Sequence, residues 1–176
     1  FGFLSGSLIS LVKAIPQVTL QSFMPAKTTW NIIKQNSVTI IPAVPTMIAL
    51  LLGAAGQGLD KTSNLKYILS GGDKLPENYI KRCTEILGVP IIEGYGLTEA
   101  SSVVSLAPGI DGIKPGKLGT LLSCVEAKIC DDSGAMLPPG KVAKLWIRGE
   151  SLPSSYYCNS ELTERYFVDG WFDTSD

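Results

Sequence analysis

Short apolar segments alternate with helical segments over the first 107 residues of this chain. The apolar runs at residues 38–41, 65–69 and 90–93 have the length and composition of buried strands. Segments 45–52 and 76–87 each begin at a proline, a residue favoured in the first turn of a helix. This alternation predicts a parallel sheet with helices on both faces. The other elements predicted in this half are helices over residues 3–15 and 26–36 and a strand over residues 18–23.

The pattern changes near residue 107, beyond which strand-like segments are separated by turns. Residues 126–130 and 142–147 are predicted strands, and the Asp131-Asp132-Ser133-Gly134 sequence between them is typical of a turn. Only residues 160–167 look helical, with Ser160 as the expected N-cap. We therefore predict two parts: an α/β subdomain over residues 1–107, and a small, mostly antiparallel, β-barrel-like subdomain over residues 108–176.

The run Glu93-Gly94-Tyr95-Gly96-Leu97-Thr98-Glu99 follows the apolar stretch at residues 89–92. Ligands usually bind at the carboxyl ends of strands in open α/β sheets. A tyrosine face can stack on a base, a threonine hydroxyl can bond a phosphate, and a glutamate can hold Mg²⁺ near phosphates. These residue types predict a nucleotide site formed by Glu93, Gly94, Tyr95, Gly96, Thr98 and Glu99.

A second glycine turn, Gly71-Gly72-Asp73, lies between the strand predicted at 65–69 and the helix predicted at 76–87. Two successive strands joined by one helix are parallel and usually adjacent, so both turns should leave the same edge of the sheet. This predicts that Gly71, Gly72 and Asp73 also face the nucleotide. Asp73 could bind the adenine amino group or could instead cap the following helix.

Two of the candidates also have purely structural interpretations. Tyr95 could be a core aromatic residue. Thr98 could simply cap a short helix that has Glu99 in its first turn.

Several segments together resemble the adenylate-forming (AMP-binding) superfamily, and among its members the acyl-CoA synthetases of the long-chain fatty-acid–CoA ligase type. The resemblance runs along essentially the whole chain. Three positions depart from the family pattern: Ser175 stands for a glycine, Lys144 for a glutamate, and Ser155 for a glycine. The resembling segments are Val44-Pro45-Thr46-Met47, Ser70-Gly71-Gly72-Asp73-Lys74-Leu75-Pro76, Tyr95-Gly96-Leu97-Thr98-Glu99, Ile113-Lys114-Pro115-Gly116-Lys117-Leu118-Gly119, Leu137-Pro138-Pro139-Gly140, Leu145-Trp146-Ile147-Arg148-Gly149 and Asp169-Gly170-Trp171-Phe172-Asp173-Thr174-Ser175-Asp176.

The resemblance implies an enzyme that activates a carboxylate with ATP and Mg²⁺ and then transfers the acyl group to a thiol, that of CoA. It implies that Thr98 and Glu99 are catalytic, with Glu99 as the metal ligand. It also implies that Asp176 binds the ribose, although a chain-terminal residue could instead be frayed. Apolar or small residues at the acyl-pocket positions imply an uncharged acyl group, a fatty acid. Those positions include Leu69, Ser102 and Val103.

Two alternatives remain beside a fatty-acyl-CoA synthetase. The thiol acceptor could be an acyl carrier protein, as in enzymes of lysophospholipid acylation, or the chain could belong to a non-catalytic homologue that keeps the fold. The chain lacks the family's upstream phosphate loop and downstream lid lysine. We therefore interpret it as a central segment of a longer ligase, and we expect the segment alone to be inactive.

The composition excludes other classes of function. The net charge of −1 offers no basic surface for nucleic acid. The chain has no histidine, and its four cysteines form no CxxC pair, so a zinc site and a disulfide framework are not expected. Its apolar runs are too short to span a bilayer. We expect a cytoplasmic protein, with peripheral membrane attachment of the full-length protein as an alternative.

Overall fold

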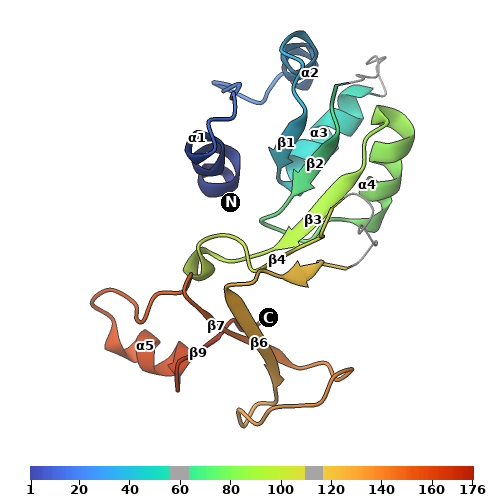
Figure 1. The fold of residues 1–176 in the computed structure, drawn as a ribbon. Coiled ribbons are helices and arrows are strands. Elements are labelled where there is room, and N and C mark those ends of the chain that lie inside the picture. Colours follow the sequence, from blue (N-terminus) through green and yellow to red (C-terminus); the bar gives the residue numbers. More distant parts are fainter. Residues whose placement is uncertain (56–63, 110–116) are drawn as a thin grey trace.

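The computed structural model describes residues 1–55, 64–109 and 117–176. Two sheets organise these residues (Figure 1): a five-stranded sheet in the order β1-β2-β3-β4-β5 and a four-stranded sheet in the order β6-β7-β9-β8. The first sheet contains β1 (Ile40–Ala43), β2 (Tyr67–Ser70), β3 (Ile91–Tyr95), β4 (Ser105–Leu106) and β5 (Thr120–Leu121). The second contains β6 (Val125–Cys130), β7 (Lys144–Gly149), β8 (Phe167–Val168) and β9 (Trp171–Asp173). The helices are η1 (Gly2–Leu8), α1 (Ile9–Val12), α2 (Ala26–Gln35), α3 (Pro45–Ala55), α4 (Glu77–Arg82), η2 (Cys83–Leu87), η3 (Thr98–Ala100) and α5 (Ser160–Tyr166).

Strands β1, β2 and β3 are parallel neighbours, which confirms the predicted parallel sheet. Strands β4 and β5, which the sequence did not reveal, add to it in antiparallel orientation. The helices lie on both sides of the sheet, with α1 on one side and α3 and α4 on the other (Figure 1). The fold is thus an α/β sheet with flanking helices, followed by a small antiparallel sheet.

Alternation along the strands divides the first sheet into two faces. Ile68 and its register partner Ile91 lie in the main core, together with Trp30 of α2 and Leu51 of α3. Leu69 has the opposite orientation, because successive side chains of a strand point to opposite faces. Its neighbours in register are Pro42 and Ile92. This second apolar face lies on the side of η1, where a Cβ added to Gly6 would meet the Pro42 ring at 3.3 Å.

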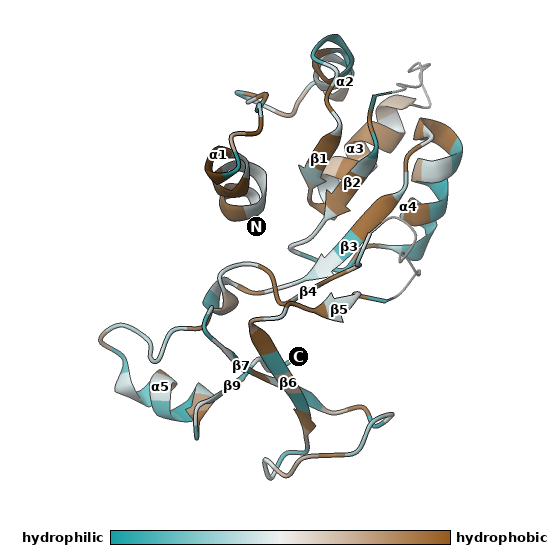
Figure 2. Cartoon of the chain, viewed as in Figure 1, coloured by the Kyte–Doolittle hydropathy of each residue, from teal (hydrophilic) through white to brown (hydrophobic). Residues whose placement is uncertain are grey.

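The helical segment at the N-terminus exposes many apolar side chains, and Figure 2 shows much of the ribbon around α1 in brown. Within the described ranges, no helix combines the length and apolarity needed to cross a bilayer. The exposed residues here are Phe3, Leu8, Ile9, Leu11, Val12 and Ile15.

The second sheet packs its apolar face against the first part of the chain. Val125, Ile147 and Phe172 are buried in the same cluster as Ala100 and Val104. On its outer face, the cationic groups of Lys128 and Arg148 lie 4.5 and 4.6 Å from the centroid of the Trp171 ring. Arg148 also donates to Glu126 at 2.7 Å, an exposed ion pair that adds little to stability.

Three sequence predictions need correction or adjustment. The strand predicted at residues 18–23 is wrong: this stretch has no strand partner, and Val18 and Leu20 remain exposed. Ser160 is not the cap of α5, because Asn159 Oδ1 accepts the hydrogen bond from the Leu162 amide at 3.0 Å. Helix α3 extends to Ala55.

Part of one resembling segment, residues 113–116 of 113–119, falls outside the described residues. Strand β5 follows residue 107 and yet belongs to the first sheet. The division of the chain at residue 107 stays a prediction.

Candidate functional site

The two glycine turns leave the same edge of the first sheet. Ser70, the last residue of β2, pairs in register with Glu93 of β3, and the two strands are parallel. The Gly71-Gly72-Asp73 turn therefore begins beside the Gly94-Tyr95-Gly96 turn, as the crossover argument predicted. A hydrogen bond links the segments next to these turns: Glu93 Oε1, at the end of β3, accepts from the Leu75 amide at 3.1 Å. In this structure, the Glu93 carboxylate therefore holds the chain after the Gly71-Gly72-Asp73 turn against β3.

Two of the glycines are explained by close packing of the chain on itself. A Cβ on Gly96 would lie 1.7 Å from the Ser102 carbonyl oxygen, and a Cβ on Gly94 would lie 2.9 Å from Leu106 Cδ1. Gly71 is similar, because its missing Cβ leaves room for the Phe1 ring at 2.9 Å. These contacts are a structural reason for glycine at three positions of the predicted nucleotide site.

Asp73 does not cap the helix that follows it. Its Oδ1 accepts from the adjacent Lys74 amide at 2.7 Å, and α4 has Pro76 at its N-cap with no side-chain bond. The capping alternative is therefore wrong. Asp73 is exposed to solvent at the end of the Gly71-Gly72-Asp73 turn.

Tyr95 and Asp176 meet although they lie 81 positions apart. The Tyr95 hydroxyl donates to Asp176 Oδ2, and burial, then this bond, raises the pKa of Tyr95 to about 12. Tyr95 is half-buried and so is not a fully enclosed core residue. Asp176 is tied to β7 through its carbonyl, which accepts from the Leu145 amide at 2.9 Å. The two residues predicted to hold base and ribose thus lie together.

Glu99 lies half-buried in η3, and its Oε1 accepts a hydrogen bond from the Tyr156 hydroxyl at 2.9 Å. Burial, then this bond, raises the pKa of Tyr156 to about 12. Thr98 is the first residue of η3 and is exposed, while the N-cap is Leu97 with no side-chain bond, so the capping alternative for Thr98 is wrong. Sequence reasoning missed Tyr156, which directly follows Ser155, one of the departures from the family pattern.

A surface pocket of about 450 Å³ surrounds Glu99. One wall comes from the turn after β3 and the other from the loop after β7. The Ser101 hydroxyl spans the two walls by donating to the Ser151 carbonyl at 2.9 Å. The pocket is lined by Thr98, Glu99, Ser101, Ser151, Leu152, Pro153, Ser155, Tyr156 and Tyr157.

The three residues assigned to an acyl pocket lie in two places. Leu69 is half-buried on the face of the sheet that η1 covers. Ser102 and Val103 follow η3, where Ser102 has φ +87° and its hydroxyl is buried without a hydrogen-bond partner. A shared acyl pocket stays a prediction.

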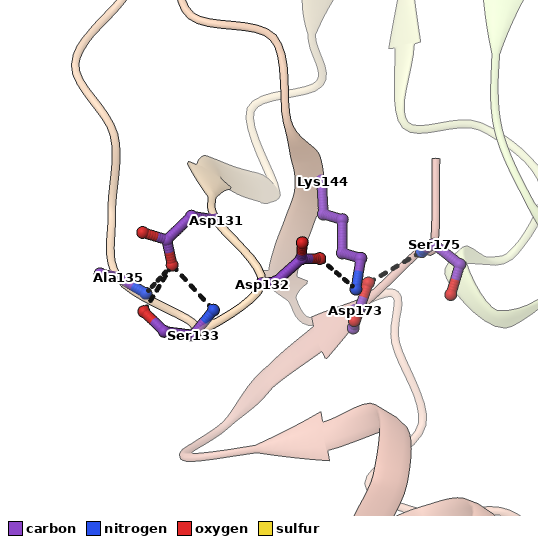
Figure 3. Close-up of polar contacts among 7 residues, drawn as sticks. All are labelled: Asp131, Asp132, Ser133, Ala135, Lys144, Asp173 and Ser175. Carbon is purple, nitrogen blue, oxygen red and sulfur yellow. Dashed lines mark hydrogen bonds and ion pairs between the residues drawn. The ribbon is translucent and has the colours of Figure 1, made fainter.

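Two of the departures from the family pattern, Lys144 and Ser175, lie on either side of Asp173 (Figure 3). Lys144 pairs with Asp132 at 3.1 Å, and that bond, with Asp173 nearby, raises the pKa of the Lys144 ammonium. Ser175 has φ +62°, a backbone conformation that favours glycine, and its amide donates to Asp173 Oδ1 at 2.9 Å. The Asp173 carboxylate thus supports the strained turn that presents Asp176.

Among the described residues, no group of three or more acidic, cysteine or histidine side chains could hold a metal ion. A single carboxylate in an open pocket still fits Mg²⁺, which is commonly bound through one or two carboxylates together with substrate phosphates. One oxygen of Glu99 accepts from Tyr156, and within the described ranges no residue donates to the other, so this carboxylate fits the ion.

In open α/β sheets, ligands usually bind at the carboxyl ends of the strands, where these two turns lie. The AMP-binding enzyme family model matches residues 1–157. The chain belongs to this adenylate-forming family.

Named relatives are CoA ligases for different acids. The 4-coumarate–CoA ligase-like 6 protein of Arabidopsis thaliana is 34% identical over 156 residues, which cover 83% of this chain and 27% of the relative. Long-chain-fatty-acid–CoA ligase of Haemophilus influenzae is 30% identical over 145 residues, covering 82% of this chain and 26% of the relative.

A solved structure shows the same fold. It is o-succinylbenzoate coenzyme A synthetase from Bacillus subtilis in complex with ATP and a magnesium ion, with a TM-score of 0.82 and 29% identity over 98% of this chain and 35% of that one. The chain thus spans only about a quarter to a third of the length of these proteins.

Proposed function

We propose that this chain is the central segment of an ATP-dependent ligase that converts a carboxylate into an acyl-adenylate and then into an acyl thioester of CoA, with a fatty acid as the carboxylate. The observation that supports the proposal is the direct contact of Tyr95 with Asp176, next to the sheet edge where the two glycine turns lie side by side, within a fold of the AMP-binding family. We keep the predicted cytoplasmic location as part of this proposal.

The nucleotide would lie across the edge of the sheet where β2 and β3 end. The exposed part of the Tyr95 ring offers a stacking surface for adenine, and Gly71, Gly72 and Asp73 line the other side of the base. Asp176 would accept hydrogen bonds from the ribose hydroxyls. Its present bond to the Tyr95 hydroxyl orients the carboxylate before ATP arrives.

Thr98 and Glu99 would act on the phosphates. The exposed Thr98 hydroxyl can donate to a phosphate oxygen, and the free oxygen of Glu99 would hold Mg²⁺. When bound, the ion neutralises phosphate charge as pyrophosphate leaves. The protein residues contribute by positioning the reactants and by stabilising charge.

The acid is assigned from the apolar side chains of Leu69 and Val103 and from the apolar neighbours of Leu69. Leu69 shares its face of the sheet with Pro42 and Ile92, which suits an uncharged chain. Ser102, beside Val103, adds one hydroxyl, too little polarity to select a charged acid. One relative is named for long-chain fatty acids and another for coumarate, so the choice of a fatty acid is tested directly.

Pyrophosphate exchange tests the proposal in the full-length ligase that carries this segment. A series of fatty acids and aryl acids is offered with ATP, and the fatty acids should support the faster exchange. Glu99→Gln should slow exchange about a hundredfold or more, because several kcal/mol of transition-state stabilisation are lost. Thioester formation from preformed acyl-adenylate should slow less.

The matched control is Glu77→Gln, which neutralises an exposed carboxylate in the first turn of α4. It should leave exchange unchanged. Equal losses in both half-reactions of Glu99→Gln would contradict the role of Glu99. Comparing CoA with an acyl carrier protein identifies the thiol acceptor. The segment alone should show no exchange above a blank without enzyme.

A further inference from the structure

We infer that Tyr156 is a positioning residue that fixes the Glu99 carboxylate in its ion-binding orientation. The inference rests on the proposed function, because it assumes that Glu99 holds Mg²⁺. The Tyr156 hydroxyl donates to Glu99 Oε1 at 2.9 Å, across 57 positions of sequence. It therefore joins the loop after β7 to the turn after β3.

The Tyr156 ring is itself held in place by α5 and the strand that follows. The backbone amide of Tyr156 donates to Thr163 Oγ1 at 3.0 Å. Its ring packs edge-on against Tyr166 at 6.3 Å and against Phe167 at 5.7 Å between centroids. Because the Tyr156 backbone is hydrogen-bonded and its ring is packed on two sides, the side chain has little conformational freedom. Its hydroxyl therefore keeps a fixed position in the pocket.

The bond divides the Glu99 carboxylate into two unlike oxygens. Oε1 is occupied by the phenol, which leaves Oε2 to face a cation. A neutral phenol supplies the donor without cancelling the carboxylate charge, as a lysine or arginine would. Hydrogen bonds of this kind orient metal ligands, and their loss typically costs ten- to a hundredfold in metal affinity or activity.

A second contact supports the same geometry. The Ser101 hydroxyl donates to the Ser151 carbonyl at 2.9 Å, two residues beyond Glu99 in one wall and five before Tyr156 in the other. The separation of the two walls is thus fixed independently, so removing the Tyr156 hydroxyl should free the carboxylate without opening the pocket.

The test uses Tyr156→Phe in the full-length ligase, with Tyr166→Phe as the matched control. Both variants lose one phenol hydroxyl from the same aromatic cluster, and only Tyr156 bonds Glu99. Binding of Mn²⁺ in the presence of α,β-methylene-ATP is followed by the electron paramagnetic resonance of the free ion. The Mg²⁺ concentration that half-saturates pyrophosphate exchange is measured in parallel.

For Tyr156→Phe we expect Mn²⁺ binding weakened about tenfold and a similar rise in half-saturating Mg²⁺, with the KM of the carboxylate unchanged. Tyr166→Phe should match the wild type. In a Glu99→Gln background, Tyr156→Phe should have no further effect, because both changes act on one interaction. A thermal melt without metal should show both phenylalanine variants folded.

Three results would overturn the inference. They are unchanged or tighter Mn²⁺ binding by Tyr156→Phe, an equal loss in Tyr166→Phe, or full additivity with Glu99→Gln. A wild-type ligase that shows no exchange with any acid would instead overturn the proposed function, and this inference with it. The two failures are therefore distinguishable.

Discussion

Replacing Gly96 with alanine should destabilise the protein strongly. A Cβ at this position would lie 1.7 Å from the Ser102 carbonyl oxygen, 2.6 Å from the Ser102 carbonyl carbon and 2.9 Å from Val103 Cα. Non-bonded heavy atoms prefer separations of about 3.5–4.0 Å, so the turn would have to withdraw by roughly 1–2 Å. All three atoms belong to the backbone and cannot rotate away as a side chain would.

The cost should be large because the Ser101–Ser102 turn is held on several sides. Ser101 is bonded to Ser151, and the Ser102 amide donates to the Leu97 carbonyl at 3.1 Å. Overpacking typically costs 1–3 kcal/mol and occasionally more, and here the displaced atoms are backbone. We expect Gly96→Ala to lower the free energy of unfolding by about 3–4 kcal/mol.

Equilibrium unfolding in urea measures this cost, with Gly53→Ala as the control. Gly53 is exposed in α3, and a Cβ there would meet nothing within 4 Å. Alanine should stabilise that helix by about 0.5–1 kcal/mol. A Gly96→Ala loss below about 1 kcal/mol would refute the close approach of the Ser102 carbonyl, since overpacking costs more than this.

Three further predictions concern the cap, a thiol and a phenol. Asn159→Ala should lower the free energy of unfolding by about 1 kcal/mol in urea, while Ser160→Ala should be nearly neutral. Iodoacetamide at neutral pH should label the exposed Cys158 in the native protein, but should label Cys83 only after unfolding. The reason is that burial raises the pKa of the Cys83 thiol to about 12. Mass spectrometry of the labelled protein measures both reactions. The free energy of unfolding should fall as pH rises from 10 toward 12. Folded Tyr95 and Tyr156, whose pKa values are both raised from 10 to about 12, bind their protons more tightly than the unfolded chain does. Tyr95→Phe should reduce this slope by the contribution of Tyr95.

The parallel half of the fold was predictable because its signals are local. Apolar runs of strand length and prolines at helix starts placed β1, β2, β3, α3 and α4 to within a few residues. The stretch at residues 18–23 has a strand-like composition and failed, because a strand also needs a partner with free backbone groups. Strands β4 and β5 have only two residues each, too short for a periodic signal.

The candidate site was predictable where a motif marks the end of a strand. The two glycine turns and Glu99 were placed this way. The bonds from Tyr95 to Asp176 and from Tyr156 to Glu99 join residues 81 and 57 positions apart, and no local pattern encodes such pairs. The cap of α5 was misplaced by one residue, because both Asn159 and Ser160 are favoured cap types and only the geometry selects one.

The core that joins Ala100 and Val104 to Val125, Ile147 and Phe172 has a consequence for how the molecule opens. Neither side of this cluster can be exposed to water without exposing the other. Loss of the small sheet should therefore release η3 at the same time, and the two regions should behave as one cooperative unit. Native-state hydrogen exchange should then give the amides of Val104 and Ile147 the same opening free energy and the same dependence on denaturant.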